Sequence, residues 1–256
     1  MVIAFCNQKG GVGKSTTCFN VGAALSRIGR RVLLIDADPQ GDISTMAGFP
    51  EVPEDMLQLY DVLHGEDIRS AIYTTDELSI IPSDDYLETA ATDMLQEPRA
   101  ALQEALSGVY SDFDYILIDC PPSLNILTIQ ALTASDGIII PVKSDYLPLK
   151  GVARLVKTVQ RVKDTFNPDL EIYGVVLTKY AGRQNLDKAV FASLHKAFGS
   201  RVYETFISKN AKLAEAPGRG ESILQYSPRS KGAEQYMALA VEIDESLKGG
   251  KHGKKE

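Results

Sequence analysis

Lysine, glycine and hydroxyl residues gather near the N-terminus in a spacing that suits phosphate binding. The run Asn-Gln-Lys-Gly-Gly-Val-Gly-Lys-Ser-Thr occupies positions 7–16, directly after an apolar segment and directly before a helical pattern. Glycines let a backbone wrap around phosphates, so that its amide hydrogens point at them. Lys14 is then expected to reach the β- and γ-phosphates, and the Ser15 hydroxyl to bind Mg²⁺. The predicted ATP-binding residues of this loop are Lys9, Gly10, Gly11, Val12, Gly13, Lys14, Ser15 and Thr16.

Two positions in this loop depart from the ordinary phosphate-loop pattern. Gln8 stands six residues before Lys14, where a glycine is usual. Lys9 adds a second lysine, which cannot easily fold back onto phosphates that Lys14 already holds. It could instead reach a nucleotide bound by a neighbouring subunit, or it could be an ordinary solvated lysine. Spacing alone does not decide between these interpretations.

Carboxylates follow at the ends of two further apolar segments, where ligands bind in open α/β sheets. Asp36 ends the segment Leu-Leu-Ile-Asp, and Asp38 enters a loop that contains Pro39 and Gly41. A carboxylate at position 38 could orient the attacking water or sense the γ-phosphate. The alternative for Asp38 is an ordinary turn-forming residue before proline.

The second carboxylate segment is Tyr-Ile-Leu-Ile-Asp at positions 115–119. A hydrophobic strand that ends in aspartate is typical of a Walker B element, which holds Mg²⁺, commonly through a coordinated water. The candidate metal-binding residues are Ser15, Asp36 and Asp119, and Lys14 and Asp38 are candidate catalytic residues.

Short apolar runs alternate with longer helical stretches along most of the chain. The runs 2–6, 31–36, 78–82, 115–119, 137–142 and 172–178 lack polar alternation, which is typical of parallel strands covered on both faces. Helices are expected over 15–28, 84–106, 149–166 and 186–198. The alternation predicts an α/β fold, a doubly wound and mostly parallel sheet flanked by helices, as in P-loop NTPases.

The bulk composition bounds the class of protein. The 256 residues are 44% hydrophobic, which suits one large core, and we expect a single domain over 1–248 and a disordered basic tail over 249–256. With 27 basic and 34 acidic residues the net charge is −7, which excludes a wholly basic protein that coats nucleic acid but leaves room for a local basic face.

The cellular location and the redox state of the cysteines are predicted from motifs that the sequence does not contain. Cys6, Cys18 and Cys120 have no Cys-x-x-Cys spacing and apolar or proline neighbours, so we expect small buried residues in a reducing compartment. We find no signal-peptide pattern and no apolar run near the ~18 residues that a membrane helix needs. These features predict a cytoplasmic protein without a membrane anchor.

Several motifs together resemble the ParA/MinD family of ATPases, and most closely its small Soj-type members. They are Lys-Gly-Gly-Val-Gly-Lys-Ser at 9–15, Asp-Ala-Asp-Pro-Gln-Gly at 36–41, the segment 115–123, and the stretches 125–136, 170–180, 207–220 and 226–236. The resemblance implies an ATP-dependent homodimer in which Lys9 crosses the subunit interface and is a further candidate catalytic residue. It also places Thr178, Lys179 and Asn210 near the adenine. Ser208 stands where the family usually has proline.

The same resemblance implies a function. Soj-type dimers bind DNA without reading its sequence, hydrolyse ATP slowly, respond to a ParB-like activator and associate with the nucleoid. The candidate DNA-binding residues lie in the C-terminal third and are Arg201, Arg219, Arg229, Lys231 and Lys248, with Lys251, Lys254 and Lys255 in the tail. Phosphate contacts need positive charge along one face. The alternative is a scatter of solvated surface charges.

Other uses of the same ATPase design are weighed against the C-terminal sequence. Residues 245–256 contain one large apolar residue, Leu247, so an amphipathic membrane helix of the MinD kind is not expected. None of the cysteines stands where nitrogenase-reductase-like proteins place cluster ligands. The alternatives that stay open are a ParA-like ATPase that positions a non-DNA cargo through another adaptor, and a metabolic enzyme such as a ligase.

Overall fold

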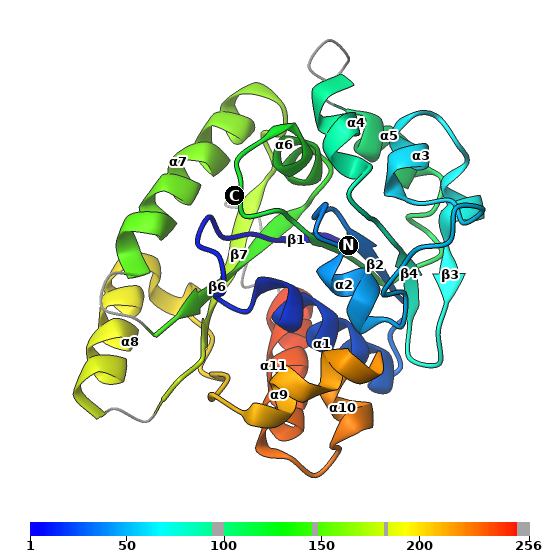
Figure 1. Cartoon of the computed structure of the whole chain (residues 1–256). Helices are drawn as coiled ribbons and strands as arrows, with labels where there is room; N and C mark the ends of the chain where they lie inside the picture. The colour runs from blue at the N-terminus through cyan, green and yellow to red at the C-terminus, as the bar shows by residue number, and fades with distance from the viewer. Residues whose placement is uncertain (94–99, 145–147, 182–183, 250–256) are drawn as a thin grey trace.

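A seven-stranded sheet forms the centre of the computed structural model, which describes residues 1–93, 100–144, 148–181 and 184–249 (Figure 1). Its strand order is β3-β4-β2-β5-β1-β6-β7, and every neighbouring pair is parallel except β3 with β4. The strands are β1 (Val2–Phe5), β2 (Val32–Asp36), β3 (Tyr73–Thr74), β4 (Ser79–Ile81), β5 (Tyr115–Asp119), β6 (Gly137–Lys143) and β7 (Glu171–Thr178). The predicted doubly wound α/β sheet is confirmed.

Helices cover both faces of this sheet, which explains why β1, β2 and β5 lack polar alternation and carry only the carboxylates Asp36 and Asp119 at strand ends. The helices are α1 (Lys14–Arg27), α2 (Asp42–Met46), α3 (Leu59–Leu63), α4 (Leu87–Asp93), α5 (Ala101–Ser107), α6 (Ile126–Thr133), α7 (Pro148–Thr165), α8 (Gln184–Phe198), α9 (Ala211–Glu215), α10 (Ile223–Tyr226) and α11 (Lys231–Lys248), with 3₁₀ turns η1 (Ile68–Ala71), η3 (Gly199–Arg201) and η4 (Ala216–Arg219).

Two hydrophobic cores result, one on each face of the sheet. Helices α3 to α8 supply the first, to which β1 adds Val2 and Ala4, and the residue after β1 adds Cys6. Helices α1, α2, α10 and α11 supply the second, to which β1 adds Ile3 and Phe5. In Figure 1 the α6 and α7 layer lies above the sheet, and the α1 and α11 layer lies below it. The alternation along β1 therefore divides its side chains between two buried layers.

The chain reverses its direction of winding beside β1, which pairs with β5 on one side and with β6 on the other. Ligands bind outside the carboxyl ends of parallel strands at such a switch point. The residues that follow β1, β2, β5 and β7 are the ones in which the sequence predicts chemistry. The topology therefore brings the predicted motifs to one edge of the sheet.

Some predicted elements differ from the observed ones. The single helix expected over 84–106 is wrong in its continuity, because Ala100 has the non-helical dihedrals φ −122° and ψ 3° and stands before α5; residues 94–99 lie outside the described part. The antiparallel edge strand β3, only two residues long, was not predicted. The tail predicted over 249–256 is described only at Gly249. None of the described helices combines the length and apolar composition of a membrane-spanning segment.

Candidate nucleotide site

The loop between β1 and α1 has the backbone that the glycine spacing predicts. Gly11 and Gly13 have φ values of 70° and 85°, in the left-handed region that residues with a Cβ rarely adopt. Helix α1 begins at Lys14, and no side chain caps its N-terminus. Its first amide hydrogens are thus left for a ligand, and the helix dipole favours an anion there. The loop and helix together form an anion-binding cradle.

Lys14 lies at the centre of the site, between the two predicted carboxylates. Its Nζ is 2.8 Å from Asp119 Oδ1, 3.3 Å from Asp38 Oδ2 and 3.3 Å from Ser15 Oγ. Burial alone would lower the pKa of Lys14, but the charges of Asp119 and Asp38 outweigh it, so the pKa lies above its usual range. Asp119 is fully buried, and its Oδ2 has no hydrogen-bond partner in the described chain. The structure therefore brings Lys14, Ser15, Asp38 and Asp119 together.

Asp36 is oriented differently from the other two carboxylates. Its Oδ2 accepts hydrogen bonds of 2.8 Å from both the amide and the hydroxyl of Ser44, and its Oδ1 accepts one of 3.3 Å from the Asp38 amide. Burial, aided by the charge of Asp119, raises the pKa of Asp36 to about 7. The carboxyl thus fixes the Asp38 loop to α2, and its predicted role as a metal ligand stays a prediction.

Sequence reasoning missed Asp42, the first residue of α2. Its Oδ2 lies 3.5 Å from Ser15 Oγ, the predicted Mg²⁺ ligand. Its position four residues after Asp38 was a weak signal, because the course of the loop decides which way it points. The described residues contain no cluster of three or more His, Cys, Asp or Glu side chains that could hold a metal on its own.

A cavity of about 260 Å³ opens above these groups. It is lined by Lys9, Gly10, Gly11, Gly13, Lys14, Ser15, Thr16, Asp38, Gln40, Asp42, Pro122 and Lys179. Lys9 is exposed at this cavity, and its amide donates a 3.0 Å hydrogen bond to Asn7 Oδ1. The Asn7 side-chain amide in turn donates one of 2.7 Å to the carbonyl of Pro141 on β6. The start of the loop is thereby anchored to the sheet.

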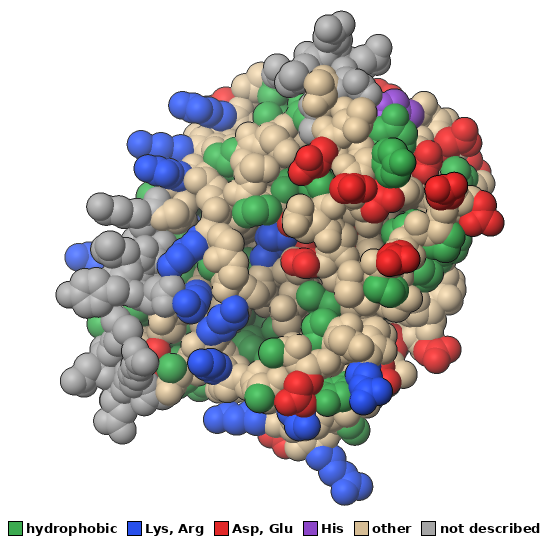
Figure 2. Space-filling model, viewed as in Figure 1, with side chains coloured by type: hydrophobic (Ala, Val, Ile, Leu, Met, Phe, Trp, Pro, Cys, Tyr) green, Lys and Arg blue, Asp and Glu red, His purple; other side chains and the backbone are tan. Residues whose placement is uncertain are grey.

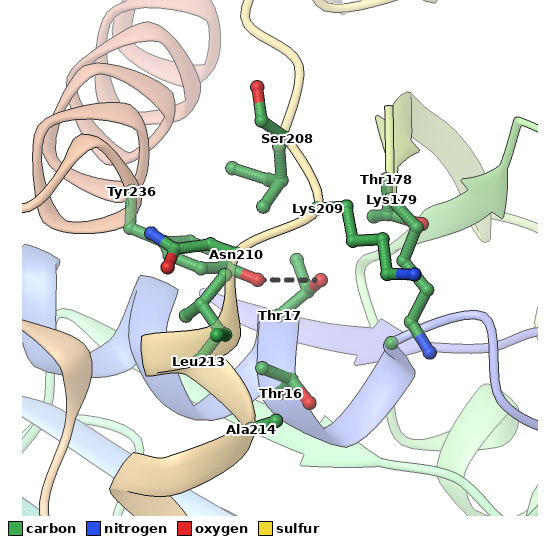
Figure 3. Close-up of a pocket in the computed structure, with 13 residues that line it drawn as sticks. Thr16, Thr17, Thr178, Lys179, Ser208, Lys209, Asn210, Leu213, Ala214 and Tyr236 are labelled. Atoms are coloured by element: carbon green, nitrogen blue, oxygen red, sulfur yellow. Dashed lines mark hydrogen bonds between the residues drawn. The ribbon is translucent and has the colours of Figure 1, made fainter. Parts of the chain in front are cut away.

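A second cavity of about 330 Å³ adjoins the first and shares Gly13, Thr16 and Lys179 with it. Figure 3 shows its lining residues, with Thr178 and Lys179 on one side and Asn210, Leu213 and Tyr236 on the other. Thr178 Oγ1 donates a 2.6 Å hydrogen bond to the Val12 carbonyl, and Lys179 Nζ one of 2.7 Å to the Gly11 carbonyl. The end of β7 therefore holds the phosphate loop and also forms a wall of the second cavity.

The segment 208–210, which follows Ile207, forms the opposite wall of the second cavity. Asn210 Oδ1 accepts a 2.9 Å hydrogen bond from the Lys212 amide and so caps α9. Ser208 is held reciprocally by Gln235 of α11, because its amide donates to Gln235 Oε1 and its Oγ accepts from Gln235 Nε2, both at 3.0 Å. The Tyr236 hydroxyl lies 3.3 Å from Thr17 Oγ1, the contact drawn in Figure 3. Thr178, Lys179 and Asn210 thus line one cavity, and their predicted place near the adenine stays a prediction.

The five predicted DNA-binding residues before the tail are exposed, but they occupy different elements; Lys251, Lys254 and Lys255 lie outside the described residues. Arg201 lies in η3, Arg219 in η4, Arg229 before α11, and Lys231 and Lys248 at opposite ends of α11. Eighteen helical residues span ~27 Å, so the last two are far apart. Lys248 Nζ also forms a 2.9 Å ion pair with Asp244.

The structure adds a basic row that was not predicted from the sequence. Arg154, Lys157 and Arg161 are exposed on α7 at spacings of three and four residues, which places them on one helix face. Figure 2 shows Lys and Arg side chains on the side of α7 to α9, and Asp and Glu side chains on the side of α3 and β3.

Comparisons with known proteins agree with this geometry. The family model of the AAA domain matches residues 1–172. The chain is 44% identical over 248 residues to the sporulation initiation inhibitor protein Soj of Bacillus subtilis, covering 94% of this chain and 97% of Soj. It is 42% identical over 249 residues to the chromosome partitioning protein ParA of Caulobacter vibrioides, covering 94% and 93%. A cobyrinic acid a,c-diamide synthase from Mycobacterium smegmatis, crystallised with ADP and magnesium, superposes with a TM-score of 0.84 at 33% identity, covering 97% and 96%.

Proposed function

Because this chain belongs to the Soj/ParA family of chromosome-partitioning ATPases, we propose that it is an ATP-driven dimerisation switch that binds DNA without sequence preference. ATP binding closes a homodimer, and the dimer holds DNA. Hydrolysis, accelerated by a ParB-like partner, dissolves the dimer and releases the DNA. The protein segregates a chromosome or plasmid in this proposal, and it works on the nucleoid in the cytoplasm.

The residues present fit ATP with Mg²⁺. Lys14 already holds a protonated amine between two carboxylates, in the position from which it would contact phosphate oxygens. The unpartnered Asp119 Oδ2 and the Ser15 hydroxyl provide the oxygen ligands that Mg²⁺ prefers, directly or through water. The metal, when bound, neutralises charge on the phosphates. The triphosphate would lie in the cavity beside Lys9 and the base in the cavity beside Asn210.

Within the site, each residue has a role that follows from its contacts. Lys14 binds phosphate, while Asp38 lies 3.3 Å from Lys14 Nζ and orients the attacking water. Lys9 is exposed at the mouth of the phosphate cavity and reaches the nucleotide of the second subunit. The ATPase is slow on its own, since in this proposal the activator completes the arrangement of the charged groups.

The observation that carries the proposal is the position of Lys9. One lysine of the loop is buried between Asp38 and Asp119, whereas the other is exposed on the rim of the same cavity. A metabolic enzyme need not dimerise when it binds ATP, so it does not require a second loop lysine at the rim of the site. Partition of DNA has such a need, because dimerisation then depends on the nucleotide.

Size-exclusion chromatography of the Lys9→Ala variant tests the dimer. With ATP and Mg²⁺, the wild-type chain should elute as a dimer and Lys9→Ala as a monomer, although the variant still binds ATP. Lys196→Ala, which removes an exposed lysine of α8, is the matched control and should dimerise normally. An ATP-dependent dimer peak from Lys9→Ala at wild-type nucleotide concentrations would refute the trans role of Lys9.

A further inference from the structure

Two thiols meet at the base of the phosphate loop. Cys6 follows the last residue of β1, and Cys120 follows the last residue of β5. Both are buried free thiols, and their sulfur atoms are 2.8 Å apart. This separation is only about 0.8 Å longer than a disulfide bond. The two sulfur atoms are thus already close to bonding distance in the reduced protein.

The backbone at this point also permits a disulfide. Phe5 and Asp119 are paired in the parallel register, and the Cys120 amide continues the ladder with a 3.2 Å hydrogen bond to the Phe5 carbonyl. Neighbouring strands lie about 4.7–4.9 Å apart, within the Cα separation of about 4.4–6.8 Å that disulfides span. Cys6 and Cys120 both belong to the core on the α6 and α7 side, so their side chains share one face of the sheet.

We propose that Cys6 and Cys120 are a reversible disulfide-forming pair that couples the redox state of the protein to its nucleotide site. The oxidant is a low-molecular-weight disulfide. One protein sulfur attacks it, forms a mixed disulfide and releases one thiol; the second protein sulfur displaces the other thiol and closes the Cys6–Cys120 bond. Two thiol protons pass to the two released thiols, so the protein pair is oxidised by two electrons and the oxidant is reduced by two.

The consequence for the site follows from the neighbours of each cysteine. Cys6 precedes Asn7, whose side chain anchors the Lys9 amide and contacts β6. Cys120 follows Asp119, whose carboxylate is 2.8 Å from Lys14 Nζ. Closing the sulfur pair draws these two strand ends together beneath the loop. The oxidised protein should therefore bind nucleotide more weakly, on the order of tenfold if one charge-assisted contact is lost.

Cys18 supplies an internal control. It lies on α1 in the core on the opposite face of the sheet, and so it is separated from the pair by the sheet itself. After equilibration of the full chain with oxidised and reduced glutathione, the free thiols should fall from three to one. Mass spectrometry should find the peptides of Cys6 and Cys120 linked. Dithiothreitol should restore all three thiols.

The variants Cys6→Ala and Cys120→Ala should each keep both remaining thiols free, whereas Cys18→Ala should still lose two. Equilibration is repeated in urea below the unfolding transition, so that the oxidant reaches the buried pair through local opening. The proposed disulfide pair would be overturned if three free thiols remain both without and with urea, or if a disulfide link involves Cys18.

Nucleotide binding is measured on the reduced and oxidised wild-type chain with a fluorescent ATP analogue. Equal affinities after complete oxidation would overturn the coupling to the site. The thiol count requires no nucleotide, so failure of the reduced chain to bind ATP would count against the proposed function and leave the disulfide pair standing.

Discussion

At the scale of single residues, the sequence identified the chemical groups of the site but not all their partners. Lys14, Ser15 and Asp119 lie together as the motif spacing predicts. The Ser44 contacts of Asp36 and the 3.5 Å approach of Asp42 to Ser15 were not predictable, because they depend on the path of the loop into α2. Spacing along a strand fixes which end a residue occupies, and loop geometry fixes the direction of its side chain.

Replacement of Lys14 by alanine should weaken nucleotide binding strongly. The change removes a buried ammonium that faces the phosphate cavity and leaves Asp38 and Asp119 to repel an anion. Since a charge-assisted hydrogen bond contributes about 1.5–3 kcal/mol, the affinity for ATP should fall at least about tenfold, and about 100-fold when the carboxylates are left uncompensated. Isothermal titration with Mg-ATP measures this, and wild-type affinity in the variant would refute the phosphate-loop assignment.

Replacement of Asp38 by alanine should trap an ATP-bound dimer. Asp38 is buried beside Lys14, and its carbonyl accepts a 2.9 Å hydrogen bond from Ser83 Oγ that alanine retains. Binding should therefore survive while hydrolysis falls by about 10²–10⁴-fold, as expected for loss of a residue that positions water by general-base contact. A phosphate-release assay measures the rate of hydrolysis, and size-exclusion chromatography of the same sample measures whether the ATP-bound dimer persists. Unchanged turnover would remove Asp38 from the mechanism.

At the scale of elements, the prediction succeeded where the pattern was long and periodic. The six predicted strands are present because continuous apolar runs bounded by turns fit a sheet buried on both faces. The break at Ala100 was missed although the sequence holds a signal for it, since Pro98 lies inside the predicted helix and proline ends or kinks a helix. Helix α11 was not predicted, and yet it closes the second core and holds Ser208 through Gln235. One of its contacts, between Tyr236 and Thr17, joins residues 219 positions apart in the sequence.

The C-terminal end of α11 is fixed by Asp244, and its loss should destabilise the fold. The carboxylate is buried and accepts two 2.9 Å hydrogen bonds from Arg30 and one of 2.9 Å from the Tyr115 hydroxyl. Asp244→Ala strands these donors, so the free energy of unfolding should fall by about 3 kcal/mol. Asp112→Ala, which breaks an exposed pair with Arg69, should cost less than about 1 kcal/mol. Urea denaturation measures the free energy of unfolding of both variants, and equal midpoints for Asp244→Ala and Asp112→Ala would contradict the anchoring role of Asp244.

At the scale of the whole molecule, charge is segregated although the chain is acidic overall. The net charge is −7, but basic side chains gather on the side of α7 to α9 and acidic ones on the side of α3 and β3 (Figure 2). By resemblance, the sequence predicts DNA-binding residues in the C-terminal third. It gave no reason to select α7, because a basic row on a helix is recognised only when the buried face of that helix is known. The C-terminal basic residues and the α7 row are therefore two candidates for the proposed DNA contacts.

The salt dependence of DNA binding separates these two surfaces. One triple variant replaces Arg219, Arg229 and Lys231 by alanine, and the other replaces Arg154, Lys157 and Arg161, so both remove three positive charges. The loss of three positive charges weakens DNA binding by both variants through long-range electrostatics. The loss of a direct phosphate contact also reduces the magnitude of the negative slope of log K against log salt, by about 0.9 for each contact. With ATP and a random-sequence duplex, we expect the magnitude of this slope to fall by up to about 5.4 in the first variant, because each of the two subunits loses three contacts. The second should keep the wild-type slope, and both should dimerise.

The reverse result would move the DNA face to α7 and clear the C-terminal residues. If the wild-type chain dimerises normally with ATP but binds no DNA, the result supports the ATPase switch and contradicts DNA binding. The alternative, a ParA-like ATPase that positions a non-DNA cargo through another adaptor, is then favoured. Equal DNA affinity with ATP, with ADP and without nucleotide would contradict the proposed switch. In that case the monomer would bind DNA by itself, and the ATP-dependent dimer would not be needed. A slope that steepens with ATP is the expected signature, since two copies of the face then bind one duplex.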